Sequence, residues 1–325
     1  MKMFITNILF GLILFVALNN STTVAPESQP PNYLWGVYST TAYSSNFNLT
    51  RLTIASGKID YYLLPTDVGK PFDILAVNET SITMVCGDVI SINIYEIDLQ
   101  TMEYNTLQSL SYNTNSVQVT LGSFGYDETT NTLFNVGYFA NGGGYKMSLL
   151  TFNFTSQRVG NIQFNGVNTT NDYGATGLFN PSVDMYFANL YSVESSTPYV
   201  YAYSTIPSVN PSFYSFPNLT QFPFMVQIED GALYGVYNSY AGYLMVYELN
   251  LNTNKTSLVY HSKNAYSGRS PAFTYGHYMV LISNPTGDEF SFTATIFNTK
   301  NKRQKDYNIE SYPYLSTGNF YIASV

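Results

Sequence analysis

Residues 133–164 read LFNVGYFANGGGYKMSLLTFNFTSQRVGNIQF, and residues 233–261 read LYGVYNSYAGYLMVYELNLNTNKTSLVYH. Each stretch contains a short aromatic and aliphatic segment, a Gly-containing hairpin, a long apolar segment, a polar turn and another short segment. Two apolar segments joined by a tight turn are typical of a β-hairpin. The two stretches therefore predict the same unit of antiparallel strands at two places in the chain.

The opening phrase of this unit recurs along the whole chain. Copies begin at Leu34, Ile82, Leu133, Met185, Leu233, Tyr278 and Phe320. Successive copies start 42 to 52 residues apart, and a nearly constant period of this length is typical of propellers and arrays. A further short strand precedes the phrase, for example PFDILAV from Pro71. Each unit is therefore predicted to contain four strands.

The period and the four-strand unit resemble β-propeller repeats in general, over about residues 33–325. The resemblance implies an all-β fold, a β-propeller of four-stranded blades. Counting predicts 25 strands, so we expect six blades, with the two chain ends closing the ring; seven blades are the alternative. No WD-type or kelch-like signature is present, so no functional family is indicated. Two β-sandwiches are the competing architecture, but no mid-chain linker supports them.

The strand composition agrees with blades that are buried on both sides. Tyr, Phe, Val, Ile and Thr dominate, and apolar positions show no helical period. The segments LMVYEL from Leu244 and YVYAYS from Tyr199 are apolar on both faces. Tyr199, Tyr201 and Tyr203 share one face of their strand. We interpret this stripe as core between blades; a surface that stacks on sugar rings or anchors a partner protein is the alternative.

The overall composition excludes two classes of protein. The chain has 325 residues, of which 45% are hydrophobic and 17% aromatic, and only 10% are charged. Disordered chains have the opposite balance. The 13 basic and 21 acidic residues give a net charge of −8, which would repel a phosphate backbone. Nucleic acid is therefore not expected as a partner.

The N-terminus is typical of a secreted protein. Lys2 precedes an uncharged apolar run from Ile8 to Leu18, which is too short to span a membrane and suits a signal peptide. We predict a signal peptide at residues 1–25, a polar linker at 26–32 and a single propeller domain at 33–325. The expected location is extracellular, with the lysosomal or endosomal lumen as the alternative. No membrane span is expected after the signal peptide is removed.

Asn-x-Ser/Thr signals agree with secretion, because this motif is the acceptor for N-glycans in secreted proteins. The motif occurs at Asn48, Asn78, Asn153, Asn168, Asn218 and Asn254. On the predicted strands, Asn48, Asn168 and Asn218 fall on one face of the ring. The other three fall on the opposite face.

Candidate catalytic and metal-binding residues are few. Cys86 lies in the apolar run ITMVCG, which predicts a buried, unreactive thiol. His261 and His277 are too far apart in sequence for a zinc-ligand pair, and His277 is predicted to lie in a turn. Arg51, Arg158, Arg269 and Arg303 fall in different units, so a shared anion clamp is not expected. No metal, cofactor or catalytic residue is predicted.

Acidic residues recur just before the opening phrase, at Asp127-Glu128, Asp184 and Glu229-Asp230. We interpret them as turn residues; a rim of carboxylates that binds a cation or a basic partner is the alternative. A hydrolase would need carboxylates that converge at inner-strand ends. The candidates for that role are Asp73, Asp127, Asp172 and Glu229.

Three functions remain open from the sequence. The first is a secreted, glycosylated recognition protein that binds an extracellular protein or a glycan. The second is a secreted or lysosomal hydrolase of propeller type. The third is a component of an extracellular matrix or coat, in which tyrosines would form cross-links. The signal peptide, the glycosylation signals and the Tyr-rich strands favour the recognition protein.

Overall fold

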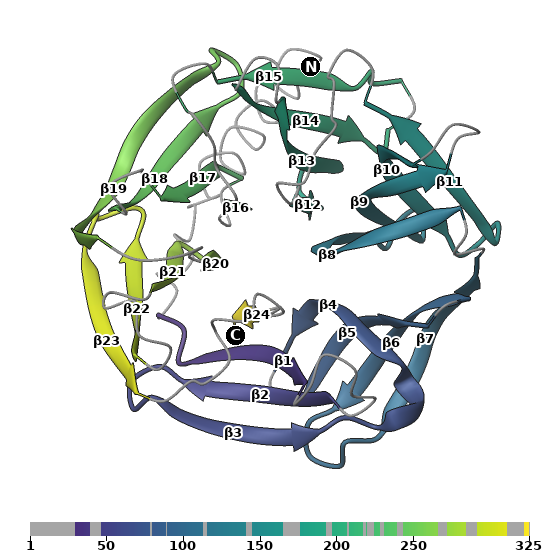
Figure 1. The fold of residues 1–325 in the computed structure, drawn as a ribbon, viewed down its shortest axis with the longest axis horizontal. Coiled ribbons are helices and arrows are strands. Elements are labelled where there is room, and N and C mark those ends of the chain that lie inside the picture. The colour runs from purple at the N-terminus through teal and green to yellow at the C-terminus, as the bar shows by residue number, and fades with distance from the viewer. Residues whose placement is uncertain are drawn as a thin grey trace, which may run out of the picture. The chain divides into compact units, whose positions relative to one another are not determined.

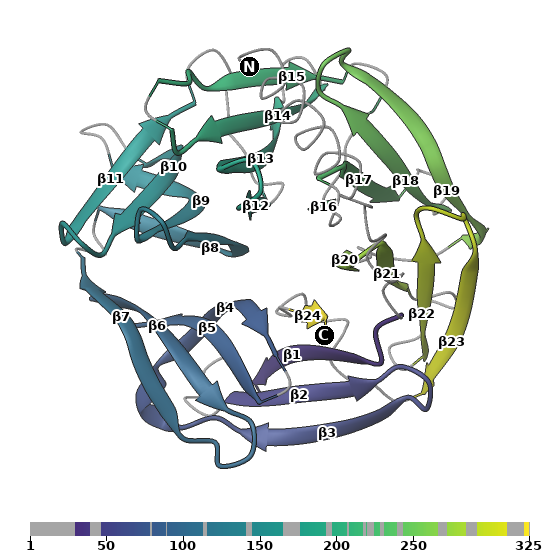
Figure 2. The ribbon, with the colours of Figure 1, turned by 180° about the vertical axis from the view of Figure 1, so that it is seen from behind.

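The computed structural model describes residues 30–39, 47–78, 80–88, 90–112, 116–140, 145–164, 176–192, 197–206, 208–216, 219, 224–227, 231–238, 243–265, 272–283, 291–310 and 322–324. Residues 31–325 belong to one compact unit. This unit is a ring of six four-stranded antiparallel sheets (Figure 1). Figure 2 shows the same ring from behind. The predicted all-β, six-bladed propeller is therefore confirmed.

The sheets are numbered in chain order and their strands are given from the inside of the ring outward. Sheet 1 contains β24 (Ile322–Ser324), β1 (Tyr33–Ser39), β2 (Phe47–Thr53) and β3 (Lys58–Leu63); sheet 2 contains β4 (Lys70–Val77), β5 (Ser81–Gly87), β6 (Ser91–Asp98) and β7 (Tyr104–Ser111); sheet 3 contains β8 (Val117–Asp127), β9 (Thr132–Ala140), β10 (Tyr145–Asn153) and β11 (Arg158–Gln163). Sheet 4 contains β12 (Gly177–Asn180), β13 (Met185–Ser192), β14 (Thr197–Ser204) and β15 (Ser212–Ser215); sheet 5 contains β16 (Phe224–Gln227), β17 (Leu233–Asn238), β18 (Tyr243–Asn250) and β19 (Lys255–Ala265); sheet 6 contains β20 (Ala272–Tyr275), β21 (Tyr278–Ser283), β22 (Ser291–Asn298) and β23 (Gln304–Glu310). A short 3-10 turn, η1 (Thr66–Val68), joins sheet 1 to sheet 2.

Both chain ends build sheet 1, as predicted. The short C-terminal strand β24 pairs with β1 through Gly36↔Ile322, Trp35↔Ala323 and Leu34↔Ser324, and Figure 1 shows the yellow β24 beside the purple β1. The segment from Phe320 was predicted to be a seventh copy of the opening phrase, which is the second strand of a blade. That prediction was wrong: its described residues form the missing inner strand. The total is therefore 24 strands in the part of the chain that the structure describes, not 25.

The core lies between neighbouring sheets. Within the described residues, buried side chains form one cluster for each pair of successive sheets around the ring. Strand β18 shows why its sequence is apolar on both faces. Leu244 and Val246 pack towards sheet 6, whereas Leu249 packs towards sheet 4. Each internal sheet is thus covered on two sides, and apolar burial stabilises the ring at about 25 cal/mol for each Å² removed from water.

The hairpins between the third and fourth strands share one design. Most of them contain a residue with a positive φ, between 52° and 68°, in their second half. These residues are Gly57, Met102, Gln157, Asn254 and Lys302. An Asp or Asn at the hairpin start accepts backbone N–H groups of the turn, as Asp98 does from Gln100 (2.9 Å) and Thr101 (2.7 Å). Such side-chain bonds are the reason that Asp and Asn favour turns.

Antiparallel order gives the ring two different faces. The hairpins between the first and second strands (in sheets 2 to 6) and between the third and fourth strands lie at one end of the strands, which we call the turn face. The middle hairpins and the connections between sheets lie at the other end.

Candidate functional site

One of the predicted hydrolase carboxylates lies on the inner strand of sheet 2. Asp73 of β4 sits at a bulge. Its Oδ2 accepts the backbone N–H of Phe124 on β8 (3.0 Å), and its Oδ1 accepts the N–H of Ile74 (2.8 Å). The residue keeps some exposed surface, but its carboxyl group is enclosed. Burial raises the pKa of the Asp73 carboxyl to about 7, while the two backbone N–H groups oppose this rise.

Strand β8 carries a large bulge next to this carboxyl, between Val119 and Phe124. The fully buried Asn135 of β9 holds the bulge in place. Its Oδ1 accepts the N–H of Thr120 (3.0 Å), and its Nδ2 donates to the carbonyl of Thr120 (2.7 Å) and to Ser123 Oγ (2.8 Å). The side chain therefore replaces the strand pairing that the bulge interrupts.

A buried phenol ties the same bulge to sheet 4. Tyr186 of β13 donates its hydroxyl to the carbonyl of Ser123 at 2.5 Å. The ring occupies the space beside Gly177, where any Cβ would overlap the phenol. Burial raises the pKa of Tyr186. The inner edges of sheets 2, 3 and 4 are thus joined by Oδ2 of Asp73, the β8 bulge and Tyr186, while Oδ1 of Asp73 is bound within its own strand by the N–H of Ile74.

Of the other acidic candidates, the described Asp127 and Asp184 lie in turns, as the sequence interpretation predicted. Asp127 is 2% exposed and accepts the N–H of Thr129 (2.9 Å) and the hydroxyl of Thr130 (2.6 Å). Asp184 has a φ of 51° at the corresponding turn of sheet 4. Asp172, Glu229 and Asp230 lie outside the described residues. The described carboxylates therefore do not converge on one point.

The remaining nucleophile and ligand candidates are also placed in the fold. Cys86 is fully buried, as predicted, and burial raises the pKa of its thiol. His277 lies in the turn between β20 and β21, as predicted. Its carbonyl accepts the N–H and the hydroxyl of Thr299. His261 is exposed on β19, with its ring 5.0 Å from the ring of Tyr243. Over the described ranges, no group of three His, Cys, Asp or Glu is arranged to hold a metal.

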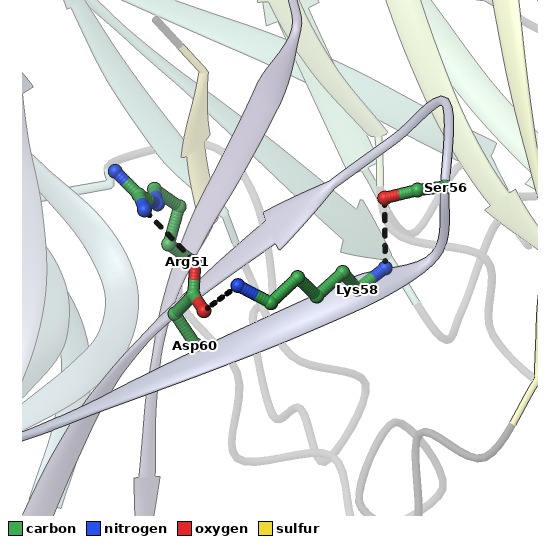
Figure 3. Close-up of polar contacts among 4 residues, drawn as sticks. All are labelled: Arg51, Ser56, Lys58 and Asp60. Atoms are coloured by element: carbon green, nitrogen blue, oxygen red, sulfur yellow. Dashed lines mark hydrogen bonds and ion pairs between the residues drawn. The ribbon is translucent and has the colours of Figure 1, made fainter.

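Arg51 forms an ion-pair cluster that the sequence did not reveal (Figure 3). Its Nη2 lies 2.8 Å from Oδ2 of Asp60, and Nζ of Lys58 lies 2.8 Å from the other carboxylate oxygen. The N–H of Lys58 also donates to Ser56 Oγ (3.3 Å). Hydrogen bonds from Lys58 and from Arg51 lower the pKa of Asp60.

Three aromatic rings surround the same guanidinium. Its Cζ lies 5.1 Å from the ring centre of Tyr33, 5.6 Å from that of Trp35 and 5.8 Å from that of Tyr62. These residues come from β1 and β3, on either side of the β2 strand that carries Arg51. The strand register Trp35↔Arg51↔Asp60 brings them together. Cation–π contacts of this kind stabilise the sheet that joins the chain ends. Arg158 and Arg303 lie in other sheets, and Arg269 lies outside the described residues.

An acidic pocket lies on the outer rim, where the connection between sheets 1 and 2 meets the outer hairpin of sheet 2. It has a volume of about 690 Å³. Pro65, Asp67, Asp98, Met102, Glu103 and Tyr104 are among its lining residues. The hydroxyl of Tyr104 donates to Asp67 at 2.5 Å, and this bond raises the pKa of Tyr104. The carboxylates would repel an anionic ligand from this pocket.

The tyrosine stripe of β14 is core, which confirms the favoured interpretation. Tyr201 is 2% exposed and packs between sheets 3 and 4. Tyr199 and Tyr203 are partly buried against the same cluster. The ring of Tyr203 lies 5.9 Å from that of Phe134 on sheet 3. This stripe is therefore occupied by blade packing.

The outer hairpin of sheet 4 departs from the pattern of the other sheets. It connects Ser204 to Ser212, and it exposes Ile206 (44%) and Val209 (45%). Val183, which is 47% exposed, lies on the neighbouring inner turn. Hydrogen bonds from the N–H and hydroxyl of Thr205 to the carbonyl of Asp184 join the two turns. We call Val183, Ile206 and Val209 the sheet-4 patch. Contiguous exposed apolar surface can mark an interaction site, so the sheet-4 patch is a candidate for one.

The described glycosylation signals lie at the predicted ends of the strands. Asn48 is near the start of β2, at the end of the middle hairpin. Asn78, Asn153 and Asn254 lie at hairpins of the turn face. Asn168 and Asn218 lie outside the described residues. Among the described residues, no helix is long and apolar enough to cross a membrane.

Neither a protein-family model nor a curated protein matches the sequence. Solved structures with similar folds include TolB from Acinetobacter baumannii, with a TM-score of 0.56 and 13% identity over 90% of this chain and 66% of that chain. The chain thus spans slightly less than two thirds of TolB. The periplasmic gluconolactonase PpgL from Pseudomonas aeruginosa has a TM-score of 0.50 and 12% identity, over 84% of this chain and 82% of that chain. At these identities the similarity shows the propeller fold alone.

Proposed function

We propose that this protein is a secreted, glycosylated recognition protein, and that it binds an extracellular protein through the sheet-4 patch. The observation that carries the proposal is the irregular outer hairpin of sheet 4. In a repeat protein, departures from the repeated unit tend to lie where a partner binds. Here the departure exposes Ile206 and Val209 beside Val183 on the turn face.

The chemistry of the patch favours a protein over a glycan. Its side chains are aliphatic, so they offer apolar contact area without hydrogen bonds. Sugar rings stack on exposed aromatic rings, and the tyrosines of β14 are occupied by packing between sheets 3 and 4. A protein with an apolar surface of its own is the partner that these side chains suit.

The rigid ring supports such a role. Packing on both sides of each sheet fixes the strand ends, and the turns are held by their own side chains, as at Asp98 and Asp127. Presenting a patch on rigid elements lowers the entropy that is lost on binding. Secretion agrees with the apolar segment at Ile8–Leu18 and with the occurrence of this fold in a protein described as periplasmic.

Binding to the surface of the cells that make the protein tests the proposal. The purified secreted protein is titrated to saturation, and the Val183→Ser/Ile206→Ser variant is compared with Leu258→Ser. Leu258 is 49% exposed on β19 of sheet 5 and does not belong to the patch, so it serves as the matched control. We expect the double variant to bind at least ten-fold more weakly and the control to bind normally. Equal binding by all three would exclude the patch, and absence of saturable binding would exclude the recognition function.

A further inference from the structure

The three sequons of the turn face differ in how their asparagine side chains are used. An N-linked glycan replaces one of the two hydrogens on Nδ2. A folded protein therefore accommodates the glycan where the amide is exposed and one N–H is not required by the fold. Where both hydrogens bind acceptors of the fold, the modification breaks one of these hydrogen bonds.

Asn254 meets the requirement. It is exposed at the last position of the outer hairpin of sheet 5, with a φ of 52°. Its side-chain amide has no hydrogen-bond partner in the described part of the chain. The sequon threonine, Thr256, follows at the start of β19. A glycan here projects from the tip of a turn and displaces nothing.

Asn78 also meets the requirement. It is exposed between β4 and β5. Its Oδ1 accepts the N–H groups of Thr80 (2.8 Å) and Ser81 (2.7 Å), while its Nδ2 donates to Ser81 Oγ (2.9 Å). One amide hydrogen is thus used and the other remains available. The turn bonds are kept when that second hydrogen is replaced.

Asn153 does not meet the requirement. It is half-buried at the end of β10, and its Nδ2 donates to Thr132 Oγ1 (2.9 Å) and to the carbonyl of Thr130 (3.3 Å). Its Oδ1 accepts the N–H of Ser156 (2.7 Å). The central residue of the sequon, Phe154, is only 4% exposed. Both amide hydrogens and the oxygen therefore hold the inner and outer hairpins of sheet 3 together.

We propose that Asn78 and Asn254 carry N-linked glycans in the secreted protein and that Asn153 remains unmodified. This rests on the proposed secretion, because these glycans are added in the secretory pathway. The pattern places one glycan on sheet 2 and one on sheet 5, which are opposite sheets of the six-sheet ring. Sheet 3, which adjoins the sheet-4 patch, stays bare at its outer hairpin, so the patch remains open to a partner on that side.

Mass spectrometry of glycopeptides from the full-length protein, secreted by eukaryotic cells, measures occupancy at each site. We expect most molecules to be modified at Asn78 and Asn254, and few at Asn153. Thr80→Ala, Thr155→Ala and Thr256→Ala each remove one sequon while keeping its asparagine, and so form a matched series. Thr80→Ala and Thr256→Ala should each make the protein migrate faster on a gel, by the shift expected for the loss of one glycan. Thr155→Ala should leave the migration unchanged.

The outcomes separate this proposal from the proposed function. Occupancy at Asn153 equal to that at Asn254 would overturn the pattern. Secretion of a chain that lacks glycans at Asn78 or Asn254 would also overturn it, while leaving the recognition function intact. A chain that never enters the secretory pathway would overturn both.

Discussion

Asp73→Asn should change the pH dependence of stability in a direction that ordinary surface carboxylates do not. The folded protein raises the pKa of Asp73 from 3.8 to about 7, because burial disfavours the charged form. Between these two values the unfolded chain has lost the proton and the native protein still holds it. The native state then binds more protons than the unfolded state, so stability falls as the pH rises from about 4 to about 7. The amide that replaces the carboxyl carries no charge at any pH, so the variant lacks this loss.

The magnitude follows from the size of the shift. Between pH 5 and the native pKa of about 7, the native carboxyl keeps a proton that the unfolded chain has lost. Over these roughly two pH units the free energy of unfolding falls by about 1.4 kcal/mol for each unit, or about 3 kcal/mol in total. For a domain of this size, 1 kcal/mol corresponds to about 2 °C in Tm. The difference in Tm between variant and wild type should therefore increase by roughly 6 °C in favour of the variant. The amide can accept only one of the two N–H groups, which costs about 1–3 kcal/mol at either pH and leaves the change with pH unaffected.

Thermal unfolding of both proteins at pH 5 and pH 8, followed by intrinsic fluorescence, is the assay. Asp98→Asn is the control, because Asp98 is an exposed turn carboxylate whose pKa is lowered by the N–H groups of Thr101 and Gln100. Its stabilising contribution is lost only as the pH falls through the lowered pKa, so its effect on Tm should be the same at pH 5 and pH 8. If the Asp73→Asn difference is also constant, the two N–H groups at Asp73 fully offset burial and the reasoning is wrong.

Three further substitutions test contacts that hold the ring. Asn135→Ala removes three buried hydrogen bonds and should lower the free energy of unfolding by about 3 kcal/mol, measured in urea; a loss under about 1 kcal/mol would show that water replaces the side chain. Gly177→Ala forces a Cβ onto the Tyr186 phenol and should cost about 3 kcal/mol, whereas Gly160→Ala, whose Cβ meets one threonine hydroxyl, should cost far less; equal Tm values for the two would contradict the packing. Arg51→Lys removes the planar guanidinium from its three aromatic rings and should lower the free energy of unfolding by about 1 kcal/mol. An unchanged Tm would show that the contacts between Arg51 and these rings do not contribute to stability.

The fold could be predicted because every blade packs against a neighbouring blade on both of its faces. A strand with a neighbour on both sides must be apolar on both faces, so the phrase at Leu133 recurs at Leu233 with the same turns between strands. The segment from Phe320 was misassigned for the same reason. An inner strand and a second strand are both buried, so composition cannot distinguish them. Only the pairing of Ile322 with Gly36 shows which place the segment fills.

The site could be predicted only where it depends on neighbours in sequence. The turn role of Asp127 is local, since its partners lie two and three residues away. The role of Asp73 is not, because Phe124 follows 51 residues later on another sheet and meets it only through the bulge of β8. The three aromatic rings around Arg51 likewise come together only through the strand register. No pattern within one segment reports such contacts.

Sheets 3 and 4 carry two neighbouring irregular features, the large bulge of β8 and the long outer hairpin between β14 and β15. The bulge of β8 adds residues to an inner strand, and a bulged strand must be held by groups from its neighbours. Asn135 does so from within the sheet, and Tyr186 does so from sheet 4. Sheet 4, already fixed to sheet 3 by this contact, can tolerate the longer connection between β14 and β15 without loosening the ring. Sheet 4 therefore combines a firmly held inner edge with exposed aliphatic residues at the turn face. This combination is the reason that we propose the partner-binding surface there.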